Sequence, residues 1–173
     1  MPVARLSNLH GMHLGDKQQW EKFTLFEEST RVPLIVIAPD VTQAGSVCSR
    51  PVSLLDVYPT LNELCSLARR DELDGESLVP LLRNPQTKRE RPAVITWGKD
   101  NHAARGERYR YIRHPDNTQQ LYDHHVDPNE WKNLAGDPQF ADVIASHRKW
   151  LPKPEAKQAP DPKQRKANSG ASR

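Results

Sequence analysis

The chain has 173 residues, which is enough for one domain or for part of a larger one. It is 36% hydrophobic and 27% charged, with 15 Pro and 8 Gly, so its low apolar share indicates a solvated portion. Residues 152–173 hold six of the 25 Lys/Arg and two of the 22 Asp/Glu. The remaining 151 residues hold 19 basic and 20 acidic residues and are therefore near neutral, which argues against a nucleic-acid partner.

The first segment with chemical character is Leu9–Lys22, in which two His, one Asp and two Lys surround Gly11 and Gly15. A loop of this composition suits an anion or a metal ion. Taken alone, a His-Gly-x-His run is a weak zinc signal, because a zinc site needs three or four ligands. From these residues alone we favour a polar surface loop.

The next two segments predict a strand and a helix. Val32–Ala38 is a continuous apolar run, which predicts a strand buried on both faces, as in α/β sheets. Ser53–Cys65 places apolar residues at helical spacing. Ser53 and Asp56 resemble a capping box, and we expect Pro59 to kink the first turns.

After a short predicted helix at Glu76–Arg83, the pattern changes to strands and turns. Ala93–Trp97 is rich in β-forming residues. Arg108–Arg113 alternates, and it can pair with Gln119–Asp123 across a turn that contains Pro, Asp and Asn. Phe140–Trp150 has the apolar spacing of an amphipathic helix.

We therefore predict an α/β fold class: the closing strand and helix of an α/β sheet, followed by a small antiparallel sheet with a packed helix. Residues 1–90 are expected to be the incomplete end of the α/β core. Residues 91–151 are expected to be a C-terminal antiparallel subdomain. Residues 152–173 are expected to be a disordered basic tail, because their composition buries little apolar area.

The two cysteines, Cys48 and Cys65, show no Cys-x-x-Cys spacing and do not indicate a disulfide. We expect Cys48 to have a structural role in its loop and Cys65 to be a core thiol. No stretch approaches the roughly 18 apolar residues of a membrane helix, so no membrane contact is expected. The first ten residues lack the apolar region of an export signal, and the sequence leaves localisation open.

Several short motifs follow one another in a characteristic order. They are His10–Lys22 (HGMHLGDKQQWEK), Thr30–Pro39 (TRVPLIVIAP), Val52–Leu61 (VSLLDVYPTL), Leu73–Leu78 (LDGESL), Glu107–Ile112 (ERYRYI), Leu121–Asp123 (LYD) and Asp127–Ala135 (DPNEWKNLA). In this order they resemble the sulfatase family, close to its iduronate-2-sulfatase-like branch. The resemblance covers residues 7–150.

The resemblance implies the C-terminal part of an alkaline-phosphatase-like fold and the hydrolysis of sulfate esters on a glycan or a similar sulfated substrate. The family's nucleophile is a formylglycine, made from Cys or Ser in a Cys-x-Pro-x-Arg motif beside a calcium ion. A hard cation held by oxygens polarises the sulfate. Lys22 matches the Lys that commonly contacts the sulfate, and His10 matches the His that follows a calcium-binding Asp. His102 and Arg105 lie in a predicted loop that can face the substrate.

The sequence departs from the family at its N-terminal end. Where the family has Ser-Asp-His-Gly, this chain has Ser7-Asn-Leu-His-Gly11, and Leu9 cannot bind calcium. The nucleophile motif is also missing, because Arg50 and Val52 stand where Pro and Arg should follow Cys48. We therefore predict that the chain alone is inactive and does not hold calcium tightly. Relatives are usually exported or lysosomal.

Two other functions stay open. A phosphatase or phosphonate monoester hydrolase of the same superfamily is one. The other is a non-catalytic remnant that binds a sulfated glycan or another polyanion, with the tail contributing weak, salt-sensitive binding.

Other polar residues have structural interpretations. We expect Asp123 and Asp127 to organise turns and His124 and His125 to be solvated. Tyr109 and Tyr111 share one face of a predicted strand, where sheet packing is expected.

Overall fold

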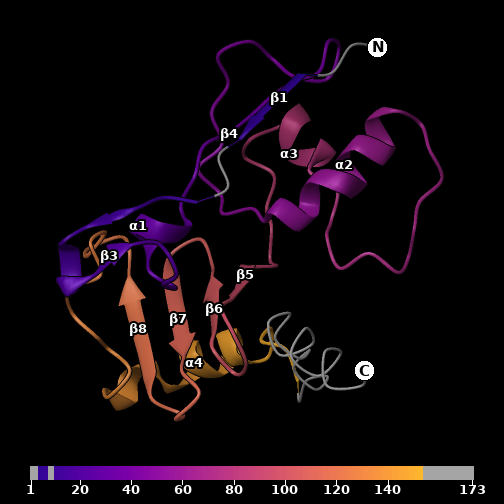
Figure 1. The fold of residues 1–173 in the computed structure, drawn as a ribbon. Coiled ribbons are helices and arrows are strands. Elements are labelled where there is room, and N and C mark those ends of the chain that lie inside the picture. The colour runs from indigo at the N-terminus through magenta and orange to yellow at the C-terminus, as the bar shows by residue number, and fades with distance from the viewer. Residues whose placement is uncertain (1–3, 8–9, 154–173) are drawn as a thin grey trace, which may run out of the picture.

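The computed structural model describes residues 4–7 and 10–153 (Figure 1). A four-stranded antiparallel sheet forms one part of the molecule, and its strand order is β5-β6-β7-β8. The strands are β5 (Ala93–Thr96), β6 (His102–Arg105), β7 (Tyr109–Arg113) and β8 (Gln119–Asp123). Helix α4 (Ala141–Arg148) follows the short 3-10 helix η3 (Pro138–Phe140) and packs on this sheet. The predicted antiparallel sheet with one packed helix is confirmed.

Each face of this sheet carries its own apolar cluster. On one face, Leu25 packs with Ala103, Ile112 and Tyr122. On the other face, α4 and its flanking residues cover a cluster built on Ala104, Tyr111, Leu121 and Leu151, with Tyr109 packed against it. The predicted packing role of Tyr109 and Tyr111 is therefore confirmed. The sheet is buried on both sides, although it is antiparallel.

The β7–β8 hairpin follows the sequence prediction closely. Tyr109 pairs with Asp123 and Arg113 with Gln119, and the backbone N–H of His114 donates to Thr118 O at 3.0 Å. Asn117 adopts a φ of 65° in the turn, a left-handed conformation that Asn tolerates. The alternating residue pattern of the two strands and the turn-forming residues between them therefore both predict this hairpin.

The other part of the molecule holds a two-stranded antiparallel sheet and two helices (Figure 1). The strands are β1 (Ala4–Ser7) and β4 (Leu34–Ile37); the helical elements are the 3-10 helix η2 (Leu54–Asp56), α2 (Val57–Leu64) and α3 (Val79–Arg83). The strand predicted at Val32–Ala38 is present, but burial on both faces is wrong. Ile35 and Ile37 are 50% and 58% exposed, because the helices cover only the opposite face within the described residues.

The capping box at the start of the predicted helix is confirmed. The Ser53 hydroxyl accepts from Leu55 N at 3.2 Å, and Asp56 Oδ2 accepts from Ser53 N at 2.8 Å. Asp56 is 1% exposed and also accepts from Glu76 N and from the Arg89 guanidinium, at 2.9 and 2.8 Å. One carboxylate therefore ties η2 to the segment before α3.

The fully buried residues of α2 are polar, and the predicted apolar stripe is partly exposed. Thr60 and Asn62 are buried, whereas Leu55 and Tyr58 are 58% and 48% exposed. Thr60 Oγ1 donates to Asp56 O and accepts from Leu78 N, which fixes this face against the start of α3. Cys65 is exposed, so its predicted place in the core is wrong.

The described residues contain no helix that is long and apolar enough to span a membrane. Of the predicted tail, residues 154–173 lie outside the described part of the chain. The boundaries predicted at residues 90 and 151 stay predictions.

Candidate functional site

The segment between β1 and β4 folds into a small hairpin that carries the predicted site residues. Strands β2 (His13–Leu14) and β3 (Trp20–Glu21) pair antiparallel around the 3-10 helix η1 (Asp16–Gln18). His10 precedes β2 and Lys22 follows β3. Pairing of the two short strands brings the two ends of this segment together.

His10 and Lys22 are in direct contact. Their Nε2 and Nζ atoms lie 3.0 Å apart, and His10 Nδ1 lies 3.0 Å from Gly11 O. An ammonium can only donate, so Nε2 accepts and the ring carries its proton on Nδ1, where it donates to the carbonyl. Within the described residues no carboxylate lies at ion-pair distance from Lys22. Its positive charge is therefore available to an anion.

The backbone around Lys22 is strained. Lys17, Gln18, Glu21 and Phe23 have φ values of 53°, 58°, 68° and 79°, in the left-handed region that side chains rarely adopt. Such conformations persist only where the surroundings fix them, and they concentrate at functional sites. This strain marks the hairpin as a candidate site.

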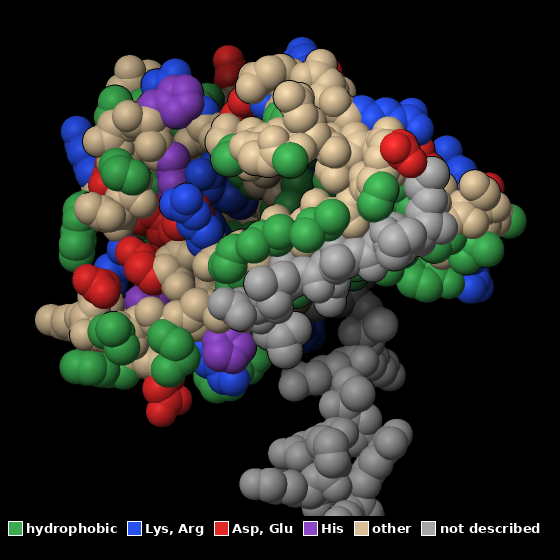
Figure 2. Space-filling model, turned by 90° about the horizontal axis from the view of Figure 1, so that it is seen from above, with side chains coloured by type: hydrophobic (Ala, Val, Ile, Leu, Met, Phe, Trp, Pro, Cys, Tyr) green, Lys and Arg blue, Asp and Glu red, His purple; other side chains and the backbone are tan. Residues whose placement is uncertain are grey.

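The hairpin borders an open groove of about 1810 Å³ that also meets β4, β5 and the loop before η2. Figure 2 shows a hollow rimmed by hydrophobic, basic and histidine side chains. The charged side chains that line the groove are five cations against two acids: Lys22, Arg31, Arg50, Arg105 and Arg110 against Glu27 and Glu107. This balance favours an anionic ligand.

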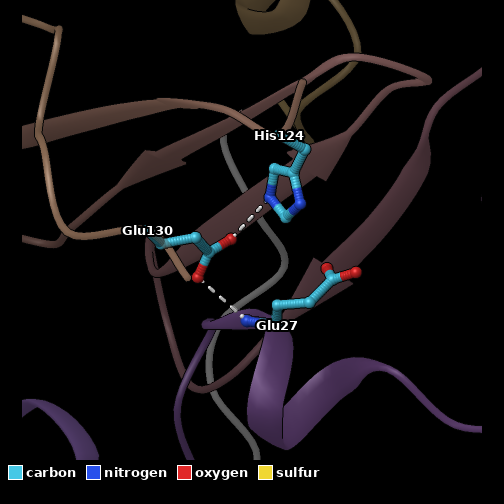
Figure 3. Close-up of side chains that lie close together, drawn as sticks. All are labelled: Glu27, His124 and Glu130. Atoms are coloured by element: carbon cyan, nitrogen blue, oxygen red, sulfur yellow. Dashed lines mark hydrogen bonds and ion pairs between the residues drawn. The ribbon is translucent and has the colours of Figure 1, made fainter. Parts of the chain in front are cut away.

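A buried network of ion pairs anchors the segment after Lys22 to the sheet. Arg110, on β7, is 1% exposed; it pairs with Glu27 and, through Nε, with Glu130 Oε1 at 2.6 Å. Its Nη1 donates to Leu25 O at 2.7 Å. Figure 3 shows how Glu130 also accepts from the backbone N–H of Glu27 at 3.0 Å and contacts His124 Nε2 at 2.9 Å. Helix α1 (Glu27–Thr30) is held in this way at its first residue.

A second anchor is the side chain of Lys17. Its Nζ donates to Asn129 O at 2.5 Å, pairs with Glu28 at 3.3 Å and lies 4.7 Å from the centre of the Trp131 ring. The ammonium also lies 5.2 Å from the Phe26 ring centre. Cation–π contacts and ion pairs together clamp η1 onto the loop after β8.

Charge pairing outweighs burial at both network carboxyls. Burial raises the pKa of Glu27, but the charges of Arg110 and Arg105 hold it below the ordinary 4.5. Burial also raises the pKa of Glu130, yet the hydrogen bond from His124 and the charge of Arg110 bring it below 4.5. Both groups are therefore carboxylates near neutral pH.

The predicted loop at His102 and Arg105 is wrong, since both residues belong to strand β6. His102 has no exposed surface and contacts Thr96 Oγ1 at 2.9 Å, so a substrate cannot reach it directly. Arg105 lies at the groove and pairs with Glu27 at 3.3 Å, so its substrate contact stays a prediction.

Other polar predictions meet mixed outcomes. Asp123 accepts from His125 N at 3.1 Å and Asp127 from Lys132 N at 2.8 Å, which confirms that they organise turns. His125 is exposed as expected. His124 is not solvated, because its side chain is 7% exposed and bound to Glu130.

The sequence interpretation missed the network of Glu27, Arg110 and Glu130. One signal for it exists: Arg110 interrupts the apolar positions of a strand that is buried on both faces, where an arginine needs a partner. Nothing in the sequence identifies that partner, because the three residues lie up to 103 positions apart.

Glu27, His124 and Glu130 bring three possible metal-ligand atoms within 4.8 Å of one another. Arg110 pairs with both carboxylates, so a cation there would have to displace a guanidinium. Calcium takes six to eight oxygen ligands. Around His10 the described residues provide an imidazole and an ammonium, which do not fit calcium.

Comparison with known proteins gives a consistent result. The family model for "N-sulphoglucosamine sulphohydrolase, C-terminal" matches residues 15–157. A sulfatase of Formosa agariphila is 37% identical over 85% of this chain and 29% of its own length. A Delta 4,5-hexuronate-2-O-sulfatase of Bacteroides thetaiotaomicron is 34% identical over 74% of the chain and also 29% of its own length. A solved 2-O glycosaminoglycan sulfatase superimposes with a TM-score of 0.71 and 30% identity, over 85% of this chain and 34% of that one. The chain thus spans about a third or less of these proteins.

Proposed function

This chain belongs to the sulfatase family, and on that premise we propose that it forms the C-terminal wall of an active site that hydrolyses sulfate esters of a glycan. The observation that carries the proposal is the contact between His10 and Lys22 at the edge of a cationic groove. The names of two similar proteins, a hexuronate 2-O-sulfatase and a 2-O glycosaminoglycan sulfatase, support a sulfated glycan as the substrate.

In this proposal Lys22 contacts a sulfate oxygen. Hydrolysis of a sulfate ester shifts negative charge onto the bridging oxygen and the sulfuryl oxygens, and a fixed ammonium stabilises that charge. Lys22 can take this role because, within the described residues, its hydrogen-bond partner is the lone pair of a neutral imidazole and not a carboxylate. His10 holds the ammonium in place while leaving two of its three N–H groups for the substrate.

Arg105 is proposed as a second, more distant cation. It lines the same groove and shares Glu27 with Arg110, so its guanidinium is held rather than free. This arrangement suits a residue that contributes positive potential to the groove. It also explains why the neighbouring acid Glu27 does not cancel the charge there.

We further propose that this chain alone neither turns over sulfate esters nor holds calcium tightly. Calcium in the family supplies a Lewis acid beside the sulfate, and the described residues near His10 do not form its oxygen cage. Cys48 is exposed, with Sγ 3.5 Å from Pro85 O, and Arg50 and Val52 replace the Pro and Arg of the nucleophile motif.

A chimera tests the proposed role. Residues 10–151 of this chain replace the matching C-terminal segment of the sulfatase of Formosa agariphila, and its activity on sulfated oligosaccharides is measured. We expect activity to survive the exchange. Lys22→Met in the chimera is expected to lower kcat/KM by about 10²–10³, the usual loss for one charge-stabilising donor.

Lys88→Met serves as the matched control, since Lys88 is exposed and lies outside the groove lining. A folded chimera in which both lysine variants retain full activity contradicts the assignment of Lys22. A chimera that cleaves phosphonate monoesters better than sulfate esters favours the phosphonate hydrolase alternative.

A further inference from the structure

An exposed aromatic pair adjoins the proposed sulfate contact. The rings of Phe23 and Trp97 stack with centroids 4.5 Å apart and planes 22° from parallel. The two side chains remain 51% and 48% exposed, and both line the groove. Large aromatic side chains that stay exposed beside a groove are typical of ligand-binding sites.

The pair is built from two parts of the chain that are 74 positions apart in sequence. Phe23 directly follows Lys22 and is presented by a left-handed backbone, with φ at 79°. Trp97 directly follows β5, and its backbone N–H donates to Asn101 O at 3.0 Å across a turn with Gly98 at φ 75°. Neither ring is needed to fill a core cluster. The strained backbone of Phe23 places its ring at the surface, and backbone strain of this kind is typical of binding sites.

Lys22 extends the pair into a row of three side chains. Its Nζ lies 5.2 Å from the centre of the Phe23 ring, and Trp97 stacks on that ring. The two rings cover each other's inner faces, so a ligand can stack on the outer face of Trp97. A ligand that matches this row has an anionic group at one end and an apolar face beside it.

We propose that Trp97, with Phe23 stacked on its inner face, presents its outer face as a stacking surface to a pyranose ring of a sulfated glycan whose sulfate is held by Lys22. The axial C–H groups of a pyranose carry partial positive charge and pack against the electron-rich aromatic surface. The excess of cations in the groove favours the further anionic groups of a polysulfated or uronic-acid-containing glycan. This inference rests on the proposed function, since it assigns a sugar-binding surface to the glycan whose sulfate reacts.

The test is equilibrium binding to the 173-residue chain by titration calorimetry and saturation-transfer NMR. The ligands are a mono-O-sulfated disaccharide, the same disaccharide without sulfate, inorganic sulfate and choline sulfate. The variants are Trp97→Leu, Phe23→Leu and Lys22→Met. Trp20→Leu is the matched control, because Trp20 is 69% exposed on the same hairpin but does not line the groove. Circular dichroism checks that each variant is folded.

We expect the sulfated disaccharide to bind at least tenfold more tightly than sulfate. Trp97→Leu and Phe23→Leu are expected to remove this gain in affinity and to leave sulfate binding unchanged. Lys22→Met is expected to weaken the binding of both the disaccharide and sulfate. Trp20→Leu is expected to change neither affinity. If both Leu variants retain the gain, the stacking surface is overturned while the role of Lys22 stands. If Trp97→Leu weakens choline sulfate but not the disaccharide, the stacking surface recognises a quaternary ammonium instead. If Lys22→Met leaves sulfate binding intact, the proposed role of Lys22 fails as well. If the chain binds no ligand at all, the stacking surface is overturned, and the chimera alone tests the proposed function.

Discussion

Replacing Arg110 by Met tests whether the buried network anchors the Lys22 segment. Arg110 is 1% exposed and faces Glu27 and Glu130, of which Glu130 is fully buried. Met keeps an unbranched apolar stem but removes the charged guanidinium, so two carboxylates lose their buried cation. Breaking a buried pair in this way costs about 3–5 kcal/mol of unfolding free energy.

For a chain of this size, about 2–4 °C of Tm accompanies each kcal/mol, so Tm falls by ~6–20 °C. Urea unfolding followed by circular dichroism gives the free energy, and a thermal scan gives Tm. Arg113→Met is the matched control: Arg113 ends the same strand, and no ion pair involves it among the described residues. A loss below about 1 kcal/mol, or one equal to that of the control, would refute the reasoning.

The same network can be neutralised as a whole. Combining Arg110→Met with Glu27→Gln and Glu130→Gln removes the cation and both anions, and buried ion pairs exchanged for neutral groups often lose little stability. We expect the triple variant to be more stable than Arg110→Met alone. A triple variant with the summed loss of the three single variants shows that the charges act independently.

Three further predictions concern pH, backbone space and turnover. The pKa values of Glu27 and Glu130 are lowered by folding, so both carboxylates stabilise the fold above pH 4.5; that stability is lost as pH falls below 4.5 through the folded pKa values. Tm measured against pH should therefore decline on acidification, and the decline should be smaller in Glu130→Gln; an equal decline contradicts the assignment. Gly11→Ala places a Cβ 1.9 Å from Glu28 O, so we expect the His10 segment to move away from α1 and sulfate binding to weaken at least tenfold in the titration described above. Unchanged binding would show that the segment adapts. The purified chain is expected to show no arylsulfatase turnover with or without calcium, and measurable calcium-dependent turnover would disprove that.

The sequence predicts best where local pattern and tertiary packing agree. The β7–β8 hairpin follows from alternating residues and a Pro-Asp-Asn turn, and the structure contains it. Strand β6 escapes prediction because His-Ala-Ala-Arg contains no β-branched residue, and alanine is depleted in strands. Its place in the sheet comes from neighbours on both sides. Where the local sequence shows no preference for a strand, packing against the neighbouring strands determines the structure.

The prediction of which face the helix after Ser53 buries fails for a different reason. The apolar spacing predicts an apolar contact face, yet the buried positions are Asp56, Thr60 and Asn62. Asp56 and Thr60 accept hydrogen bonds from the backbone N–H groups of Glu76 and Leu78, just before α3, which the sequence does not reveal. Apolar periodicity therefore locates the helix but not the face that it buries.

The candidate site divides in the same way. Motif resemblance identifies His10 and Lys22, and the structure places them in contact. The residues that hold the segment after Lys22 come from β7 and from the loop after β8, and no local pattern connects them. The sequence therefore predicts the residues proposed to contact the sulfate, but not the residues that hold them in place.

The residues of the buried network lie far apart along the chain: Leu25 and Glu27 on one side, Arg110 and Glu130 on the other. This separation has a consequence for biosynthesis. Glu130 is made 103 residues after Glu27, and Arg110 is made 85 residues after Leu25. At about 5–20 residues per second, the ribosome needs about 5–20 seconds to add them. During that time the nascent segment with Lys22 has neither its ionic partners nor the sheet face that covers Leu25. Its strained backbone therefore forms only after β8 and the loop that follows it have been made, and a ribosome that stalls before β8 leaves this segment open to chaperones and proteases.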